Sequence, residues 1–269
     1  MTTYLNQCLR ENKIIRWPET CFPLTFYIAP FRWYKAQNEG YKYIALVKRA
    51  LETWERVSGG KVKFKTVGNL NDSQINLDWK RIDRKALGHC YFHFDAIGRL
   101  YSAEVQIGLS DGIIHAQYQD ENEVYHTILH EIGHALGLGH SPNQQDIMYT
   151  PHRYGVINLS ENDGETLRWL YKLPLGATVK EISNKFNIPS DDLDYIISKY
   201  TGNRAPSGFE EVKRSIVLPK KDLTKDQETL AEIKKFNLGL QNIQIPSNVQ
   251  EYIKKNIVLN KDKKSPKQY

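Results

Sequence analysis

The chain has 269 residues, of which 40% are hydrophobic, and a formal net charge of +6 at pH 7. A chain of this length and composition can bury one sizeable core and a small second one. Residues 172–269 hold 18 basic and 12 acidic residues and so carry the whole excess charge, which argues against general nucleic-acid binding by the balanced remainder.

No targeting or membrane-spanning segment is visible in the sequence. There is no run of about eighteen apolar residues, so we expect no membrane span. Met1–Arg10 lacks the apolar core of a signal peptide, and the compartment therefore stays open between a cytoplasmic protein, leaderless export and a misplaced start codon. Three cysteines, Cys8, Cys21 and Cys90, are too few for a disulfide framework, although one pair remains open.

Hydrophobic periodicity predicts helices and strands after an expected N-terminal tail, residues 1–15. From Glu39 to Val57 the apolar residues recur at three- and four-residue steps, which predicts an amphipathic helix that ends at Ser58-Gly59-Gly60. Residues 62–66 and 75–79 alternate apolar and polar side chains and are predicted strands.

Two further helices complete the predicted domain. One covers Val124–Leu136, and Ser160 caps another that ends near Tyr171. Helices that alternate with strands of this kind predict an α+β domain in which a sheet packs on helices.

The character of the chain changes after Pro174. Residues 174–260 are predicted to form a helical C-terminal appendage of unknown role, followed by a basic, disordered tail over 261–269. Binding of this tail to an anionic surface is the alternative to a solvated end. The helices of the appendage are predicted at 178–189, 191–200 (with Ser190 as a cap), 223–240 and 249–259.

A metal-binding pattern begins at His130. The segment reads His-Glu-Ile-Gly-His-Ala-Leu-Gly-Leu-Gly-His and fits H-E-x-x-H-x-x-G-x-x-H, in which His130 and His134 share one helix face. Gly137 lets the chain leave the helix and bring His140 to the same ion. Three imidazoles suit zinc and leave one coordination position for water, as in catalytic zinc sites, and Glu131 is placed to take the proton of that water.

The residues after the third histidine resemble a known family. Ser141 follows directly, and Met148 lies in Asp146-Ile147-Met148-Tyr149-Thr150-Pro151. This segment resembles the Met-turn of the metzincins, and with Ser141 it is similar to that of the matrixins, the matrix metalloproteinase clan. A methionine at this place would form a soft, apolar floor under the zinc site.

The resemblance extends over about residues 16–173. Arg16-Trp17-Pro18 and Pro23–Ile28 resemble the opening strand of a matrixin catalytic domain, Ala50–Glu55 its first long helix, and Leu159–Asp163 the start of its closing helix. The resemblance implies a metzincin-type twisted mixed sheet packed on helices, with an active-site helix and a Met-turn, over residues 16–173.

The resemblance also implies where a substrate would bind. Leu87 and Gly88 correspond to the edge strand that pairs with an extended peptide in the family, although an ordinary strand without a ligand would read the same way. Tyr149, Pro151 and Tyr154 would line the pocket for the side chain after the cut.

Two metal sites of the family have weak counterparts here. The structural zinc of matrixins uses a His-x-Asp and two further histidines, whereas only His89 is suitably placed and Glu104 stands where the last histidine is expected. We therefore expect one catalytic zinc and no second, structural one. Calcium has no support beyond Asp95 with Gly98 and Asp111 with Gly112, because Asp-Gly turns form without metal.

The cysteine motif that blocks the zinc in the propeptide of animal matrixins is not found in this sequence in its usual form. No Pro-Arg-Cys-Gly-type motif precedes the domain. Cys8 is the alternative zinc-blocking thiol, because a thiolate is a good zinc ligand, and a plain tail thiol is the other interpretation.

These observations predict a monomeric zinc metalloendopeptidase with a peptide or protein substrate and no nucleic-acid partner, in which calcium is possible but unsupported. A binding or scaffold protein with an idle zinc site is one alternative, although Glu131 would then have no purpose beside the metal. A zinc hydrolase that acts on something other than a protein is the second alternative.

Overall fold

The computed structural model describes residues 2–31, 37–81, 87–109 and 120–202. The chain divides into two units, residues 1–207 and 208–269, and every described residue belongs to the first. The helices predicted over 223–240 and 249–259 and the basic tail 261–269 lie outside the described residues.

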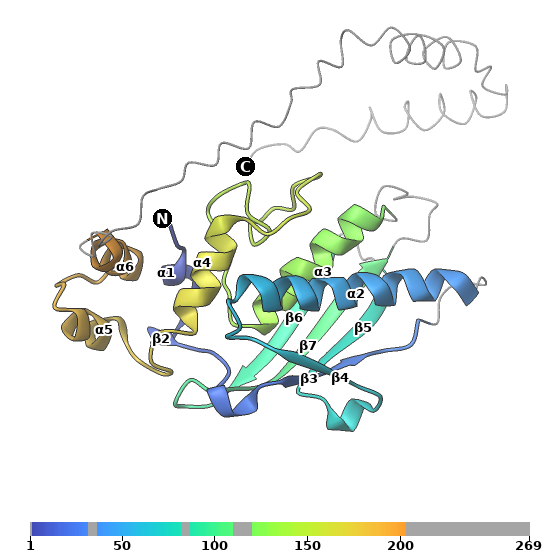
Figure 1. Ribbon diagram of the computed structural model, residues 1–269, viewed down its shortest axis with the longest axis horizontal. Helices are drawn as coiled ribbons and strands as arrows, with labels where there is room; N and C mark the ends of the chain where they lie inside the picture. Colours follow the sequence, from blue (N-terminus) through green and yellow to red (C-terminus); the bar gives the residue numbers. More distant parts are fainter. Residues whose placement is uncertain (1, 32–36, 82–86, 110–119, 203–269) are drawn as a thin grey trace, which may run out of the picture. The chain divides into compact units, whose positions relative to one another are not determined.

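A five-stranded mixed sheet forms the centre of the first unit (Figure 1). Its order is β4-β3-β5-β7-β6, and among these strands only β6 runs antiparallel to its neighbour. Strand β6 is therefore an edge strand, with Gly88 opposite Ile107 of β7. The strands are β3 (Leu24–Ile28), β4 (Phe64–Val67), β5 (Ile75–Arg81), β6 (Gly88–Phe94) and β7 (Leu100–Leu109).

Two long helices, α2 (Gln37–Val57) and α3 (Glu121–Ala135), lie on one side of the sheet (Figure 1). They contact each other, and α3 also contacts β6 and β7. Trp54 of α2 is fully buried, and its Nε1–H donates to the carbonyl of Leu129 at 3.1 Å. Burial of a large apolar side chain contributes about 1.5–3 kcal/mol, so α2 holds α3 firmly at the residue before His130.

The predicted α+β fold, a mixed sheet packed on helices, is confirmed. The helix predicted from Val124 begins earlier, at Glu121, because the carboxylate of Asp120 caps it by accepting from Asn122 N at 2.8 Å. The strand predicted from Val62 begins at Phe64 instead. Val62 N donates to the hydroxyl of Ser58 at 3.0 Å, so its amide serves the end of α2 rather than the sheet.

The segment before residue 16 is folded, where the sequence predicts a tail. It forms a short helix, α1 (Leu5–Cys8), and a hairpin of β1 (Leu9–Arg10) and β2 (Lys13–Ile14). Glu11 and Asn12 between them have φ of 50° and 60°, as a two-residue hairpin turn requires. Its buried side chains are those of Tyr4, Leu5, Cys8, Ile14 and Ile15. The apolar surface buried there explains why the segment packs instead of remaining free.

Three helices follow the metal-binding segment: α4 (Glu161–Leu170), α5 (Val179–Phe186) and α6 (Leu193–Gly202). Helix α1 contacts both α4 and α6 (Figure 1). The two short helices expected after Pro174 are thus present as α5 and α6, and Ser190 Oγ accepts from Asp192 N at 3.0 Å just before α6. No described helix is long and apolar enough to cross a membrane.

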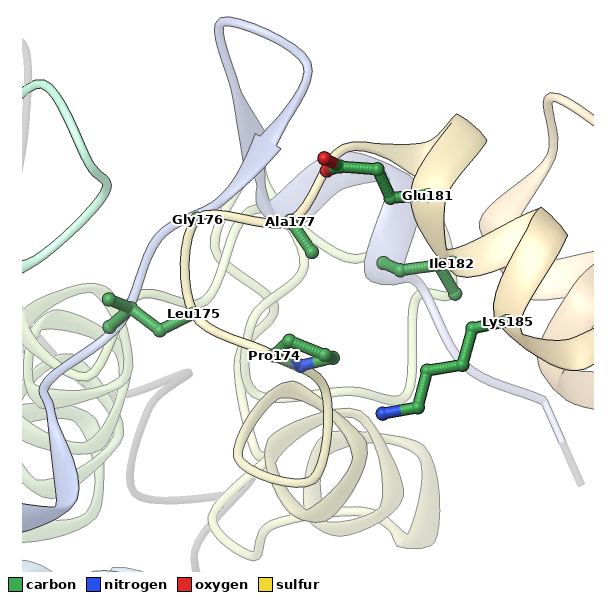
Figure 2. Close-up of a pocket in the computed structure, with 7 residues that line it drawn as sticks. All are labelled: Pro174, Leu175, Gly176, Ala177, Glu181, Ile182 and Lys185. Atoms are coloured by element: carbon green, nitrogen blue, oxygen red, sulfur yellow. The ribbon is translucent and has the colours of Figure 1, made fainter.

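A small pocket of 360 Å³ lies where the chain turns from the domain into α5 (Figure 2). Glu181 at its rim is already engaged, because its carboxylate accepts from Thr178 N at 2.8 Å in a capping box. None of the pocket's residues is a predicted site residue. They are Pro174, Leu175, Gly176, Ala177, Glu181, Ile182 and Lys185.

Candidate metal centre

The three predicted metal ligands come together in the structure. His134 Nε2 lies 3.1 Å from His130 Nε2 and 3.2 Å from His140 Nε2, and the three donor atoms lie within 4.8 Å of one another. Gly137 has φ of +98°, which turns the chain out of α3 toward His140. A tetrahedral zinc with nitrogen ligands at about 2.0–2.1 Å needs those atoms roughly 3.3 Å apart, so the two spacings from His134 fit the ion.

Backbone carbonyls fix the orientation of two of these rings. His130 Nδ1–H donates to the carbonyl of Ile147 at 2.7 Å, and His134 Nδ1–H donates to that of Leu138 at 2.9 Å. With the proton held on Nδ1, the lone pair of Nε2 faces the site. Burial, followed by the charges of neighbouring histidines, lowers the pKa of His130 to about 3, and burial lowers that of His134 to about 4. Both rings are therefore neutral ligands at pH 7.

Met148 lies directly beneath the metal-binding helix. It is fully buried, and a Cβ on Gly133 would overlap its Sδ and lie 3.1 Å from its Cε. Ser141 N donates to the carbonyl of Met148 at 2.8 Å. The chain thus returns under α3 at Gly133, which lies between the two helical histidines in sequence, where the Met-turn was predicted.

Glu131 lies between the metal ligands and the edge strand. Its side chain is buried, and burial raises its pKa to about 8. A Cβ on Gly88 would lie 2.7 Å from both Cγ and Oε1 of Glu131 and 2.9 Å from Cγ2 of Thr127. The first residue of β6 therefore has room for no side chain, and the carboxylate rests against the strand for which the family resemblance implies substrate binding.

Replacement of Gly88 by Ala should disturb catalysis without disturbing the metal. The added methyl group would push the Glu131 carboxylate from its place, and a misplacement of about 1 Å can cost up to about 100-fold in rate. For the zinc endopeptidase that the sequence predicts, we expect kcat to fall about 10- to 100-fold with unchanged zinc affinity, as measured by peptide cleavage and zinc titration. Gly68→Ala, whose Cβ meets nothing within 4 Å, is the matched control. An unchanged kcat in Gly88→Ala would contradict this placement of Glu131.

The other predicted substrate residues differ in exposure. Leu87 is half-buried, and its carbonyl accepts from Gly108 N at 2.8 Å, which ties the start of β6 to β7. Tyr149 is half-buried, whereas Pro151 and Tyr154 are exposed. His89 is also exposed on β6, with its ring centroid 5.9 Å from that of Tyr91.

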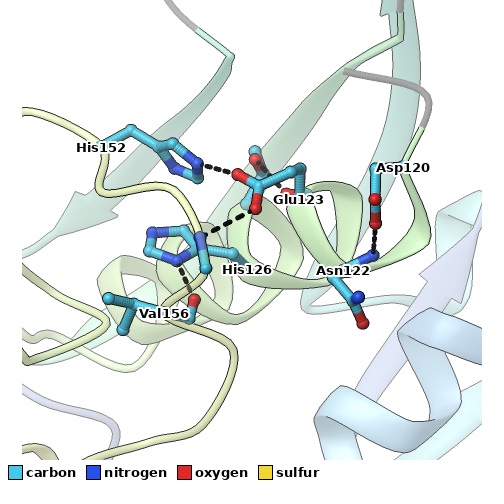
Figure 3. A network of polar contacts seen from close by, with 8 residues as sticks. Asp120, Asn122, Glu123, His126, His152 and Val156 are labelled. Atoms are coloured by element: carbon cyan, nitrogen blue, oxygen red, sulfur yellow. Dashed lines mark hydrogen bonds and ion pairs between the residues drawn. The ribbon is translucent and has the colours of Figure 1, made fainter. Parts of the chain in front are cut away.

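A polar network holds the loop that follows the Met-turn (Figure 3). The buried carboxylate of Glu123 accepts from His152 Nε2 and, at 3.1 Å, from Gly155 N. His126 Nδ1–H donates to the carbonyl of Val156 at 2.5 Å. Both Glu123 and His126 belong to α3, so the metal-binding helix also positions the loop that carries Pro151 and Tyr154. No sequence pattern singles out this network.

A second network supports the carbonyl that orients His130. Asp163 of α4 accepts from Ile147 N at 2.9 Å with one oxygen and from the Tyr4 hydroxyl at 2.8 Å with the other. The carbonyl of the same residue, Ile147, accepts the hydrogen bond from His130 Nδ1–H. Asp163 stands three residues after the capping Ser160, and this capping box is the one sequence signal that could have drawn attention to it.

Cys8 lies away from the three metal-binding nitrogens, in a buried position. Its Sγ accepts from Gly139 N at 3.3 Å, and burial raises its pKa to about 12. A buried thiol of this kind is protonated at neutral pH. The structure therefore gives Cys8 a packing contact beside the loop of the third histidine, and Cys8 is not among the three side chains that converge there.

Only one of the two Asp-Gly turns that could bind calcium lies within the described residues. Asp95 is occupied by its own turn, because its carboxylate accepts from Ile97 N at 3.1 Å and from Arg99 Nε at 2.6 Å. Asp111 and Gly112 lie outside the described residues.

Comparison with known proteins agrees with this geometry. The model of the matrixin family matches residues 16–172. A putative matrix metalloproteinase of Heliothis virescens ascovirus 3e is 26% identical over 161 residues, which cover 50% of this chain and 33% of that protein. A probable matrix metalloproteinase of invertebrate iridescent virus 3 is 32% identical over 133 residues, or 44% of this chain and 35% of that one.

An animal protein also matches this chain. Rat stromelysin-2 is 26% identical over 141 residues, which cover 46% of this chain and 27% of that protein. The matched part of the chain thus spans only 27–35% of the length of these three relatives.

Proposed function

Because the chain belongs to the matrixin family of metallopeptidases, we propose that it is a zinc-dependent endopeptidase with Glu131 as its general base. The convergence of His130, His134 and His140 beside that carboxylate is the observation that carries the proposal. In this proposal, residues 16–173 carry out catalysis and bind one catalytic zinc. The protein is a monomer, and residues 174–260 form a helical appendage.

The residues of the chain divide the chemistry among them. Zinc, when bound by the three histidines, supplies a Lewis acid for the scissile carbonyl and makes bound water more acidic. Glu131 accepts a proton as the water oxygen attacks the carbonyl carbon, and it returns a proton to the leaving amine when the C–N bond breaks. Its raised pKa, about 8, makes its carboxylate a stronger base than that of an ordinary glutamate.

The proposed substrate is a peptide or protein in an extended conformation. Strand β6 pairs only with β7 among the described strands, so its other edge can pair with a peptide backbone. Leu87 and Gly88 would contribute this edge close to Glu131. Tyr149, Pro151 and Tyr154 would flank the pocket for the side chain after the cut, on the loop that Glu123 holds.

Metal removal tests the proposed function directly. We expect the purified chain to cut a diverse peptide mixture at internal bonds, to lose this activity with a strong chelator, and to regain it when zinc is added back. Mass spectrometry of the products identifies the cuts. Cleavage that survives complete removal of the metal, or no cleavage by the zinc-loaded chain, would contradict the proposal.

A further inference from the structure

The folded N-terminal segment lies against the loop that carries the third histidine of the metal centre. Gly139 precedes the third histidine, and a Cβ placed on it would overlap the carbonyl oxygen of Gln7. Its N–H also donates to Cys8 Sγ at 3.3 Å. Residues 7 and 8 therefore lie against the backbone of the loop that carries His140, and β1 (Leu9–Arg10) continues from this contact.

The helical appendage holds the hairpin from the other side. The carboxylate of Asp194 in α6 accepts from Leu5 N at 2.7 Å, Asn6 N at 3.1 Å and Thr3 Oγ1 at 2.6 Å. In the opposite direction, Leu193 N donates to the side-chain oxygen of Asn6 at 2.9 Å. Helix α1 thus donates backbone hydrogen bonds to the start of α6 and accepts one from it, which gives the following hairpin a fixed place.

The guanidinium of Arg10 is held over the edge strand. Its Nη1 donates to the carbonyls of Gln7 at 3.0 Å and Leu9 at 2.9 Å, and its Cζ lies 5.7 Å from the ring centroid of Phe92 in β6. The same Gln7 carbonyl faces Gly139, so the guanidinium lies between the strand proposed for substrate and the third-ligand loop. Its positive charge also lowers the pKa of His140, after the larger effect of burial.

This cation has no acidic partner within the described part of the chain. Its only hydrogen bonds there are the two from Nη1 to backbone carbonyls, and the ion pairs of neighbouring elements join other residues, such as Arg99 with Asp95 and Arg16 with Glu19. Two hydrogen bonds and an aromatic ring orient the group, while Nη2 and Nε remain available. A planar guanidinium of this kind is suited to two parallel hydrogen bonds with a carboxylate.

We propose that Arg10 is a specificity-determining residue that binds an acidic side chain of the peptide substrate, at one fixed position along the β6 edge. This inference rests on the proposed endopeptidase function and names a substrate class for it. An extended peptide on β6 would pass Phe92 on one side of the metal ligands, and a Glu or Asp side chain there would reach the free guanidinium nitrogens. The folded N-terminal segment then serves recognition as well as stability.

Paired peptides test the proposal. A fluorogenic peptide that the chain cleaves is synthesised with Glu or the isosteric Gln at each position on both sides of the scissile bond. At one position we expect kcat/KM to be about three- to tenfold higher for Glu than for Gln, as for a partly exposed charge pair, and this preference should shrink with added salt. In Arg10→Gln the ratio at that position should fall to about one.

Two variants serve as controls. Lys13→Gln removes a cation from the position opposite Arg10 in the same hairpin, where Nζ donates to the carbonyl of Ala96 at 3.2 Å, and should keep the preference. Arg10→Lys keeps the charge but loses the planar fork, and should keep a reduced preference. Thermal unfolding checks that each variant is folded.

The outcomes separate this inference from the function on which it rests. A folded Arg10→Gln that keeps the wild-type Glu/Gln ratio, or a wild-type chain without a preference at any position, would overturn the role of Arg10 and leave the endopeptidase proposal intact. If the zinc-loaded chain cuts no peptide, the endopeptidase proposal fails. Fluorescence anisotropy of a labelled peptide series, with Glu or Gln at each position in turn, then decides on Arg10, since tighter binding of a Glu peptide that Arg10→Gln abolishes supports it and equal binding overturns it.

Discussion

Replacement of Glu131 by Gln will lower kcat about 10²- to 10⁴-fold, the usual contribution of general acid–base catalysis. Gln has nearly the same shape but cannot accept the proton of the attacking water. The carboxylate is not one of the three convergent nitrogen donors, so we expect zinc affinity to change little. Steady-state cleavage of a peptide, together with zinc quantification on the purified variant, measures both effects.

The matched control for this variant lies on the same helix. Glu121→Gln changes an acidic residue of α3 that forms an exposed ion pair with Lys42 at 3.1 Å and takes no part in the metal centre. We expect it to keep the wild-type rate. A Glu131→Gln protein with bound zinc and wild-type kcat would show that another group moves the proton.

The metal centre was predictable because its chemistry is local in the sequence. A four-residue step on one helix sets His130 and His134 side by side, and Gly137 supplies the positive φ that the turn toward His140 needs. The structure brings all three together without rearrangement. The amphipathic pattern of α2 likewise specifies which face of that helix is buried.

The contacts that support the centre were not predictable, because they join residues far apart in the chain. Asp163 and Tyr4 are 159 positions apart, and Asp194 and Leu5 are 189 apart. Periodicity describes one element at a time and carries no information about such pairs. Residues 1–15 also contain apolar side chains, but the segment is too short for a period to separate a packed hairpin from a tail.

One of these long-range contacts, between Gly139 and the N-terminal segment, directly precedes the metal ligand His140. A Cβ at residue 139 would overlap the carbonyl oxygen of Gln7 and lie 2.5 Å from its carbon and 3.1 Å from Cys8 N. These are backbone atoms, so no side-chain rotation can relieve the clash. The loop of His140 and the start of the chain would have to separate.

Replacement of Gly139 by Ala will therefore weaken zinc binding as well as the fold. We expect zinc affinity to fall about 10- to 100-fold, the usual cost of disturbing the surroundings of a metal ligand, and the free energy of unfolding of the metal-free protein to fall by about 1–3 kcal/mol, as for overpacking. Competition with a chromophoric chelator measures the first quantity and denaturant unfolding the second. Gly68→Ala, with its Cβ in open space, should change neither. If folded Gly139→Ala bound zinc as tightly as the wild-type chain, the N-terminal segment would not position His140, and its packing would serve stability alone.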